Sequence, residues 1–214
     1  LMDIRKIDKG QMSLMFKKAE IVSFTRDLLE SFEQQTRVKK LDLKFHTSAP
    51  EIEMWIDPKN FDKIILNLLS NACKFTPENG QVEISLSTGE DTHLPQNAPL
   101  RRYVELTVAD SGIGIASTER EHIFERFYQI RNSQNNSNIG TGIGLHLTRS
   151  LVELHYGNIH VEDNGEGRPG SRFIIRLPLG NGHLKKEEIE EATTADTLIN
   201  IPAAEPATIA PPLP

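Results

Sequence analysis

The chain has 214 residues, of which 37% are hydrophobic and 25% charged, as is ordinary for a globular domain with one sizeable core. Its net charge of −6 is concentrated toward the C-terminal end, because the sequence from His183 onward has two lysines and six acidic residues. The rest of the chain lacks the basic excess that non-specific nucleic-acid binding requires, so we expect no DNA contact by this segment.

Cysteine usage and hydropathy argue against a disulfide- or metal-stabilised domain and against a membrane-spanning segment. The single cysteine, Cys73, cannot form an internal disulfide and belongs to no Cys/His metal cluster, which favours a reducing compartment. No apolar run approaches the roughly 18 residues that a membrane-spanning helix needs. Because the chain starts at Leu1 rather than a methionine, we expect a fragment of a longer protein, with any membrane anchor outside it.

The first predicted element, residues 1–11, has the pattern of a helix end. Leu1, Ile4 and Ile7 recur at helical spacing, and Gly10 is placed to stop the helix. A helix this short is not stable alone in water, so we interpret it as the last turns of a longer one. Residues 13–19 are then expected to be extended.

Two helices and two strands follow. A helix over residues 21–36 is predicted from an apolar stripe, and alternation predicts strands over 41–45 and 52–56. Asp57-Pro58 is a capping carboxylate followed by a first-turn proline, and it predicts a helix that runs to about Phe75 and ends at Thr76-Pro77.

The last part of the domain alternates strands with one helix. Strands are predicted over 81–88 and 102–109, a glycine-punctuated polar segment over 110–141, and a helix over 142–156. Two more strands, 158–163 and 171–177, flank a turn at 164–170. These elements predict an α/β two-layer sandwich, with a mixed sheet and the helices on one side. Residues 181–214 are acidic and then Ala/Pro-rich, which predicts a linker or tail.

The helix over 58–75 carries a polar ridge beside its core stripe. Phe61, Ile64, Ile65, Leu68, Ala72 and Phe75 are expected to face the core. Asn67, Asn71 and Lys74 recur at i, i+4 and i+7 along one edge. Amide oxygens and an ammonium suit a magnesium-bound polyphosphate, although a plain solvated face uses the same residues.

Two glycine-bearing stretches complete the candidate chemistry. Asp110-Ser111-Gly112-Ile113-Gly114-Ile115 follows a strand, where a carboxylate can accept a hydrogen bond from an exocyclic amine; a simple β-turn is the alternative. The second stretch, residues 140–145, opens a helix, whose free N–H groups and positive dipole end attract phosphate.

Competing nucleotide and metal motifs are excluded. Leu145 and Ser117 stand where G-x-G-x-x-G would need its third glycine, and the chain contains no Walker A, H-R-D or H-E-x-x-H signature.

Five motifs occur in a fixed order: N-x-x-x-N-A-x-K-F, D-x-G-x-G-I, F-x-R-F, G-T-G-x-G-L and G-S-x-F. In this order and spacing they resemble the N, G1, F, G2 and G3 boxes of the histidine-kinase branch of the GHKL ATPases, over about residues 13–180. The resemblance implies a Bergerat fold, with a mostly antiparallel sheet, helices on one face and a flexible ATP lid over about residues 128–139.

The resemblance also implies a role for each matched residue. Asn71 would coordinate Mg²⁺ at the phosphates of ATP, assisted by Asn67, and Lys74 would contact phosphate. The adenine pocket would be formed by Phe75, Asp110, Gly112, Gly114, Ile115 and Ser171. The phosphates and the lid would involve Phe127, Gly140, Thr141, Gly142, Gly144 and Leu145. Arg131, in the lid, could supply charge to the phosphates or be an exposed arginine with no role. Phe124, Arg126 and Phe127 would dock the domain on its dimerisation helices.

One position separates branches of that superfamily. Hydrolysing members carry a glutamate one helical turn before the metal asparagine, and here that position is Asn67, which is no base at neutral pH. The resemblance therefore implies phosphotransfer rather than fast hydrolysis. A chaperone-, gyrase- or mismatch-repair-type ATPase and a docking module without nucleotide remain as alternatives.

The resemblance places the chain in a two-component system. Residues 1–12 would end the second dimerisation helix, and the phosphate-accepting histidine would lie upstream, since none of the seven histidines present is in an upstream helix. The implied partners are the protein's own dimerisation domain, in a homodimer, and the receiver domain of a response regulator, in a separate protein or the same chain. The implied location is the cytoplasmic side of a sensor anchored in the inner membrane.

Overall fold

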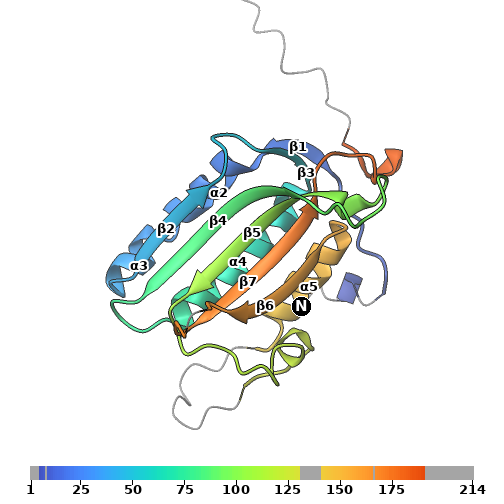
Figure 1. Cartoon of the computed structure of the whole chain (residues 1–214). Coiled ribbons are helices and arrows are strands. Elements are labelled where there is room, and N and C mark those ends of the chain that lie inside the picture. The colour runs from blue at the N-terminus through green and yellow to red at the C-terminus, as the bar shows by residue number, and fades with distance from the viewer. Residues whose placement is uncertain (1–4, 8, 131–140, 166, 191–214) are drawn as a thin grey trace, which may run out of the picture.

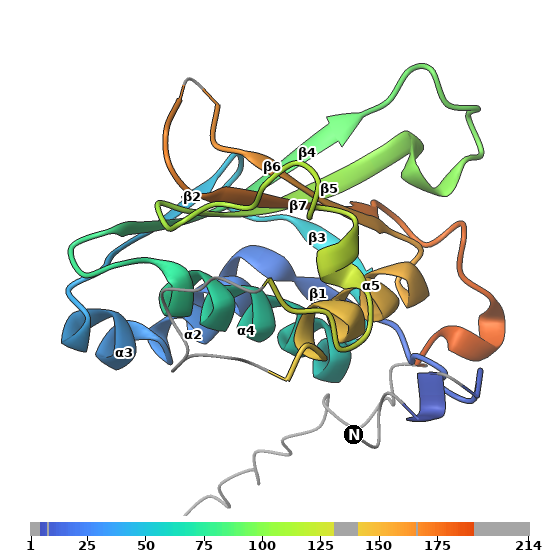
Figure 2. The ribbon, with the colours of Figure 1, turned by 90° about the horizontal axis from the view of Figure 1, so that it is seen from below.

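The computed structural model describes residues 5–7, 9–130, 141–165 and 167–190, which fold into two layers (Figures 1 and 2). One layer is a five-stranded sheet in the order β2-β4-β5-β7-β6. β2 pairs with β4 in parallel, and the other neighbours are antiparallel. The strands are β2 (Asp42–Thr47), β4 (Gln81–Glu90), β5 (Arg102–Asp110), β6 (Asn158–Asp163) and β7 (Ser171–Pro178). This confirms the predicted mixed, mostly antiparallel sandwich.

The second layer consists of helices that cover one face of the sheet (Figure 2). They are α2 (Ile21–Glu30), α3 (Glu33–Val38), α4 (Pro58–Phe75) and α5 (Gly144–Leu154). Short 3₁₀ turns occur in the connections, at η1 (Pro99–Arg101), η2 (His122–Phe124) and η3 (Lys186–Glu188). The core lies between the layers, where buried residues of α4 and α5 meet the inward-facing residues of β4, β5 and β7. No helix within the described ranges is long and apolar enough to cross a membrane.

A small two-stranded sheet anchors the start of the helix layer. β1 (Lys17–Glu20) pairs antiparallel with β3 (Glu53–Ile56), and Glu20 is the N-cap of α2. One carboxylate oxygen of Glu20 accepts from the backbone N–H groups of Val22 and Ile52, at 2.8 and 2.9 Å. Burial acts to raise the pKa of Glu20, but the hydrogen bonds to its carboxylate outweigh burial and lower it to about 2. The side chain thereby fixes α2 to the strand pair.

The central helix α4 begins and ends where local signals predict. Oδ1 of Asp57 accepts from the backbone N–H of Asn60 at 3.2 Å, with Pro58 in the first turn. At the other end, the buried Thr76 hydroxyl donates to the carbonyl of Ala72 at 2.6 Å. These caps hold an 18-residue helix across the sheet.

The segment over 21–36 differs from its prediction, because it forms two helices instead of one. The backbone N–H of Ser31 donates to Leu28 at 3.2 Å, and that of Phe32 donates to Leu29 at 2.9 Å. These i→i−3 hydrogen bonds tighten the chain and end α2, while the Phe32 ring stays in the core at 8% exposure. The apolar stripe is therefore kept across a break in the backbone.

Residues 181–190, expected to begin the linker, lie against the domain instead. Phe16 donates its N–H to the carbonyl of Glu188 and accepts from the N–H of Glu190, at 2.6 and 2.8 Å, which places Phe16 and Ile189 in a parallel bridge. The Tyr156 hydroxyl also donates to the Glu188 carboxylate at 2.7 Å. Burial and this hydrogen bond raise the pKa of Tyr156 to about 12. Residues 191–214 lie outside the described part.

Candidate functional site

The predicted motifs meet beside the C-terminal half of α4. Short distances, measured from an ideal Cβ placed on each glycine, show how closely the segments approach. A Cβ on Gly112 would lie 2.5 Å from the carbonyl oxygen of Phe75, and a Cβ on Gly144 would lie 2.3 Å from Oδ1 of Asn67. Gly114 lies 3.1 Å from the carbonyl oxygen of Gly170. Helix α4, the turn after β5, the turn before β7 and the start of α5 therefore surround one region.

Asp110 is the buried carboxylate of this region, at the end of β5 and 6% exposed. Its Oδ1 accepts from the Gly112 N–H at 2.8 Å, and its Oδ2 accepts from the Ser171 hydroxyl at 2.6 Å. Burial raises the pKa of Asp110, and these hydrogen bonds oppose part of that rise. The Ser171 backbone also hydrogen-bonds this carboxylate, and the three bonds leave a lone pair for a further donor, such as an exocyclic amine.

The backbone around Asp110 permits no side chain at Gly170. Gly170 has φ +103°, and a Cβ there would lie 1.7 Å from the carbonyl oxygen of Asp110. The side chain of Asn164 closes the same turn, because its Nδ2 donates to the carbonyls of Asp110 and Pro169, both at 2.7 Å. The turn before β7 thus sets the position of the carboxylate at the end of β5.

We predict that Gly170→Ala destabilises the domain about 2 kcal/mol more than Gly165→Ala does. Gly165 is a matched control, because it lies in the same turn with φ +73° but a Cβ there would meet nothing within 4 Å. Both variants remove the same flexibility from the unfolded chain, so the difference reports the overlap with Asp110. Urea unfolding of the two variants measures it, and equal midpoints would contradict the close approach.

On the polar ridge of α4, all three side chains are partly buried. The Asn67 Nδ2 donates to Oγ1 of Thr148, on α5, at 2.7 Å, which leaves the amide oxygen beside Gly144. Lys74 places its ammonium 5.0 Å from the centre of the Phe75 ring, a cation–π distance. The side chain of Asn71, between them, makes no hydrogen bond to any residue within the described ranges, so its amide is available to a ligand.

Phe75 corrects one prediction. It was expected in the core stripe of α4, but its ring is 44% exposed, whereas Leu69 and Cys73 are buried. The last turn of α4 brings the Phe75 carbonyl against the Gly112 turn, so this exposed residue lies beside the site. This position is compatible with its other predicted role of lining a flat ring.

The start of α5 offers uncapped backbone donors. Ile143 is the N-cap residue, and no side chain of the described chain caps the helix there. Gly142 has φ +65°, and a Cβ there would lie 2.7 Å from the backbone of Phe127.

The remaining predicted site residues are spread around these segments. Thr141 is exposed and Leu145 packs against the core. Ile115, after the Asp110 turn, also packs against the core. Gly140 and Arg131 lie outside the described residues.

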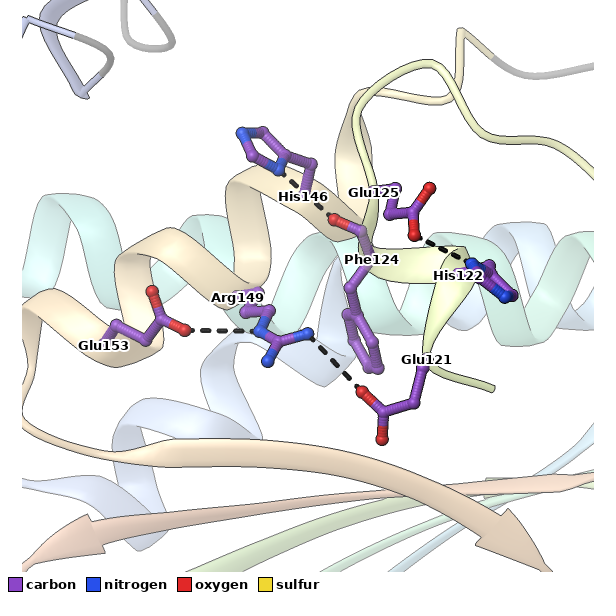
Figure 3. A network of polar contacts seen from close by, with 7 residues as sticks. All are labelled: Glu121, His122, Phe124, Glu125, His146, Arg149 and Glu153. Carbon is purple, nitrogen blue, oxygen red and sulfur yellow. Dashed lines mark hydrogen bonds and ion pairs between the residues drawn. The ribbon is translucent and has the colours of Figure 1, made fainter. Parts of the chain in front are cut away.

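The F-x-R-F segment is fixed to α5 by the polar network in Figure 3. The buried Phe124 ring packs edge-on against Phe173 at 6.3 Å, and its carbonyl accepts from His146 Nδ1 at 3.2 Å. Arg149 lies 5.5 Å from the Phe124 ring and bridges Glu153 and Glu121, at 3.2 and 3.9 Å.

The other end of this segment faces outward. Phe127 is 60% exposed and has φ +65°. Its backbone N–H donates to the carbonyl of Gly142 at 2.8 Å, and the Arg126 guanidinium lies 4.9 Å from the centre of its ring. The segment therefore has one buried aromatic anchor and one exposed aromatic.

Thr148 and Asn164 are residues of the site that the sequence did not single out. Thr148 is 81 positions from its partner Asn67, and Asn164 is 54 from Asp110. Neither pairing leaves a local signal, although the Asn-Gly dipeptide at 164–165 does mark the turn.

Comparison with known proteins gives one family and several relatives. Residues 56–181 match the model of the histidine kinase-, DNA gyrase B- and HSP90-like ATPases. Among curated proteins, the chain is 37% identical over 179 residues to the sensor histidine kinase TmoS of Ectopseudomonas mendocina. The match covers 84% of this chain and 17% of TmoS, and other curated relatives that it matches are likewise much longer than this chain.

Among solved structures, the catalytic domain of histidine kinase ThkA is similar, with a TM-score of 0.63 and 25% identity. The match covers 78% of this chain and 99% of that one. Full-length ShkA, solved in complex with AMPPNP, also has a TM-score of 0.63, at 27% identity over 79% of this chain and 32% of that one.

Proposed function

This chain belongs to the family of histidine kinase-, DNA gyrase B- and HSP90-like ATPases and is an ATP-binding domain of the histidine-kinase type, and from that premise we propose that it binds Mg-ATP and supplies the γ-phosphoryl group to a histidine on an upstream helix. The observation that carries the proposal is the arrangement around α4. A buried carboxylate lies at one end. On the helix, the Asn71 side chain has no hydrogen-bond partner among the described residues, and none of their side chains caps the start of α5.

The buried Asp110 carboxylate supports adenine recognition. It is held by Gly112 and Ser171, yet keeps a lone pair for an exocyclic amino group. Gly112 and Gly114 let the turn after β5 pack closely on the backbone of Phe75 and Gly170, which holds the carboxylate in place. The exposed Phe75 side chain would provide an apolar wall. ShkA, which shares this fold, is solved with an adenine nucleotide analogue.

The donor set also fits magnesium. No group of three or more His, Cys, Asp or Glu side chains that could hold a metal occurs in the described part of the chain. Mg²⁺ does not need such a group, because it keeps several waters and is bound through substrate phosphates and few protein oxygens. Asn71 would supply the protein oxygen, and bound magnesium would neutralise charge on the phosphates. Lys74 and the start of α5 would hold the phosphates on either side.

The position one turn before Asn71 favours transfer over hydrolysis. Asn67 has no proton-accepting group at neutral pH, and its amide is engaged by Thr148. Position 67 therefore supplies no general base to water near the γ-phosphate. Phosphoryl transfer relies on alignment and charge neutralisation, so an imidazole brought in line by another domain is the better nucleophile.

The exposed part of the F-x-R-F segment supports the proposed partners. Phe127 presents an aromatic ring on a segment that Phe124 anchors, as a docking surface for the dimerisation helices of the same protein requires. We place this domain on the cytoplasmic side of a dimeric sensor, with the receiver domain of a response regulator as the phosphate acceptor. The match to TmoS, a sensor histidine kinase, supports this assignment.

Incubation of the full-length protein with γ-labelled ATP and Mg²⁺ tests the proposal. We expect a label that is lost in acid and kept in alkali, as a phosphoramidate is, and no label on the 214-residue chain alone. Rapid steady-state hydrolysis by the chain alone would instead favour a hydrolysing ATPase. Failure of Mg-ATP to raise the melting temperature of the chain would favour a docking module without nucleotide.

A further inference from the structure

Lys39, directly after α3, reaches the C-terminal end of α4. Its ammonium donates to the carbonyl oxygen of Cys73 at 2.7 Å and to that of Lys74 at 3.0 Å. These residues are 34 and 35 positions away in the chain, and Lys39 is partly buried by the contact. A lysine after a short helix would otherwise be read as a solvated surface residue.

The contact completes the hydrogen bonding of the α4 terminus. The last four carbonyls of a helix have no partner within the helix, and positive charge is favourable at that end. Here Thr76 bonds the Ala72 carbonyl through its N–H and hydroxyl, at 3.0 and 2.6 Å. Lys39 takes the next two carbonyls, and the Phe75 carbonyl packs against Gly112. The last turn is therefore held from three sides, and Lys39 supplies the charged contact.

This turn joins the two halves of the proposed nucleotide site. It carries Lys74, on the phosphate side, and Phe75, on the adenine side, and its final carbonyl lies against the turn that orients Asp110. Loss of two charged hydrogen bonds would let the turn fray, which would move both side chains without removing either. The effect of Lys39 would thus appear in nucleotide affinity before it appears in the fold.

We propose that Lys39 is a positioning residue for nucleotide binding, which acts by fixing the last turn of α4 so that Lys74 and Phe75 meet the nucleotide. The inference rests on the proposed function of the site. It deepens that function by assigning a role to a residue outside the five motifs, directly after α3.

Calorimetry with the 214-residue chain and Mg·AMPPNP tests this role. Lys39→Met keeps the length and apolar stem of the side chain but removes the charge, and we expect it to weaken binding about tenfold. Lys39→Arg restores donors and charge and is expected to bind within about threefold of the wild type. Lys40→Met, at the exposed neighbouring position, is the matched control and is expected to bind as the wild type does.

A second measurement separates positioning from general support of the fold. In a Lys74→Ala background, Lys39→Met should weaken binding about threefold or less, because part of what it positions is already absent. An undiminished tenfold effect in that background, or wild-type affinity in Lys39→Met itself, would overturn the inference. If Lys39→Met does not fold, Lys39→Gln replaces it in the same scheme. Failure of the wild-type chain to bind Mg·AMPPNP would overturn the proposed function instead.

Discussion

Replacing Asn71 with alanine is expected to lower the rate of histidine phosphorylation by the full-length protein about a thousandfold, a loss of about 4 kcal/mol of transition-state stabilisation. The reason is the position of Asn71 on the polar ridge of α4. It lies between Asn67, which Thr148 engages, and Lys74, which leans over the Phe75 ring. Its amide makes no hydrogen bond to a described residue, so its oxygen is available to magnesium.

Transfer of label from γ-labelled ATP at saturating Mg²⁺ measures this effect. Ser70→Ala is the matched control, since Ser70 is the exposed neighbour of Asn71 on the same helix, and it should label at the wild-type rate. The free energy of unfolding of Asn71→Ala, measured with urea, should stay within about 0.5 kcal/mol of the wild type, because the residue is only partly buried. Labelling above a tenth of the wild-type rate would contradict the assignment of Asn71 as a magnesium ligand.

The second large effect is expected at Asp110. Asp110→Asn should weaken binding of Mg·AMPPNP to the 214-residue chain about a hundredfold, or about 2.7 kcal/mol. An amide at this position has one oxygen instead of two, and its NH₂ group must face either the Gly112 N–H or the Ser171 hydroxyl. The adenine amino group then loses its acceptor, or the pocket keeps a buried donor without a partner.

The control for this change is Asp42→Asn, at the exposed start of the edge strand β2, which removes the same charge two strands away from Asp110. It should bind the analogue with wild-type affinity. A guanine analogue adds a second test, because its ring presents a carbonyl oxygen where adenine has an amine. The wild type should bind it poorly, and equal binding of both bases would exclude Asp110 as the adenine acceptor.

Elements with local signals could be predicted, and those set by distant contacts could not. The bounds of α4 follow from Asp57-Pro58 and Thr76-Pro77, which act within a few residues. The break between α2 and α3 has no glycine or proline to mark it, and the apolar stripe continues through it. The parallel pairing of β2 with β4, and the packing of residues 181–190 on Phe16 and Tyr156, join segments far apart in the chain. No local pattern contains that information.

The same distinction applies to the candidate site. Asn67, Asn71, Lys74 and Asp110 could be selected because each belongs to a motif whose spacing indicates chemistry. Thr148, Asn164 and Lys39 hold those motifs in place, and each is ordinary in its own stretch of sequence. Helix periodicity predicted Phe75 in the core, but α4 turns its last residue toward the Gly112 loop. Supporting residues therefore require the tertiary structure, whereas the ligand-contacting ones are visible in the motifs.

A crystal structure of the 214-residue chain grown with Mg²⁺ and AMPPNP tests the central claim most directly. We predict that the adenine amino group lies within hydrogen-bond distance of the Asp110 carboxylate, with magnesium on the Asn71 side-chain oxygen and phosphates at the start of α5. A nucleotide bound elsewhere, or protein side chains filling the space beside Asp110 while the nucleotide is present in excess, would contradict the claim.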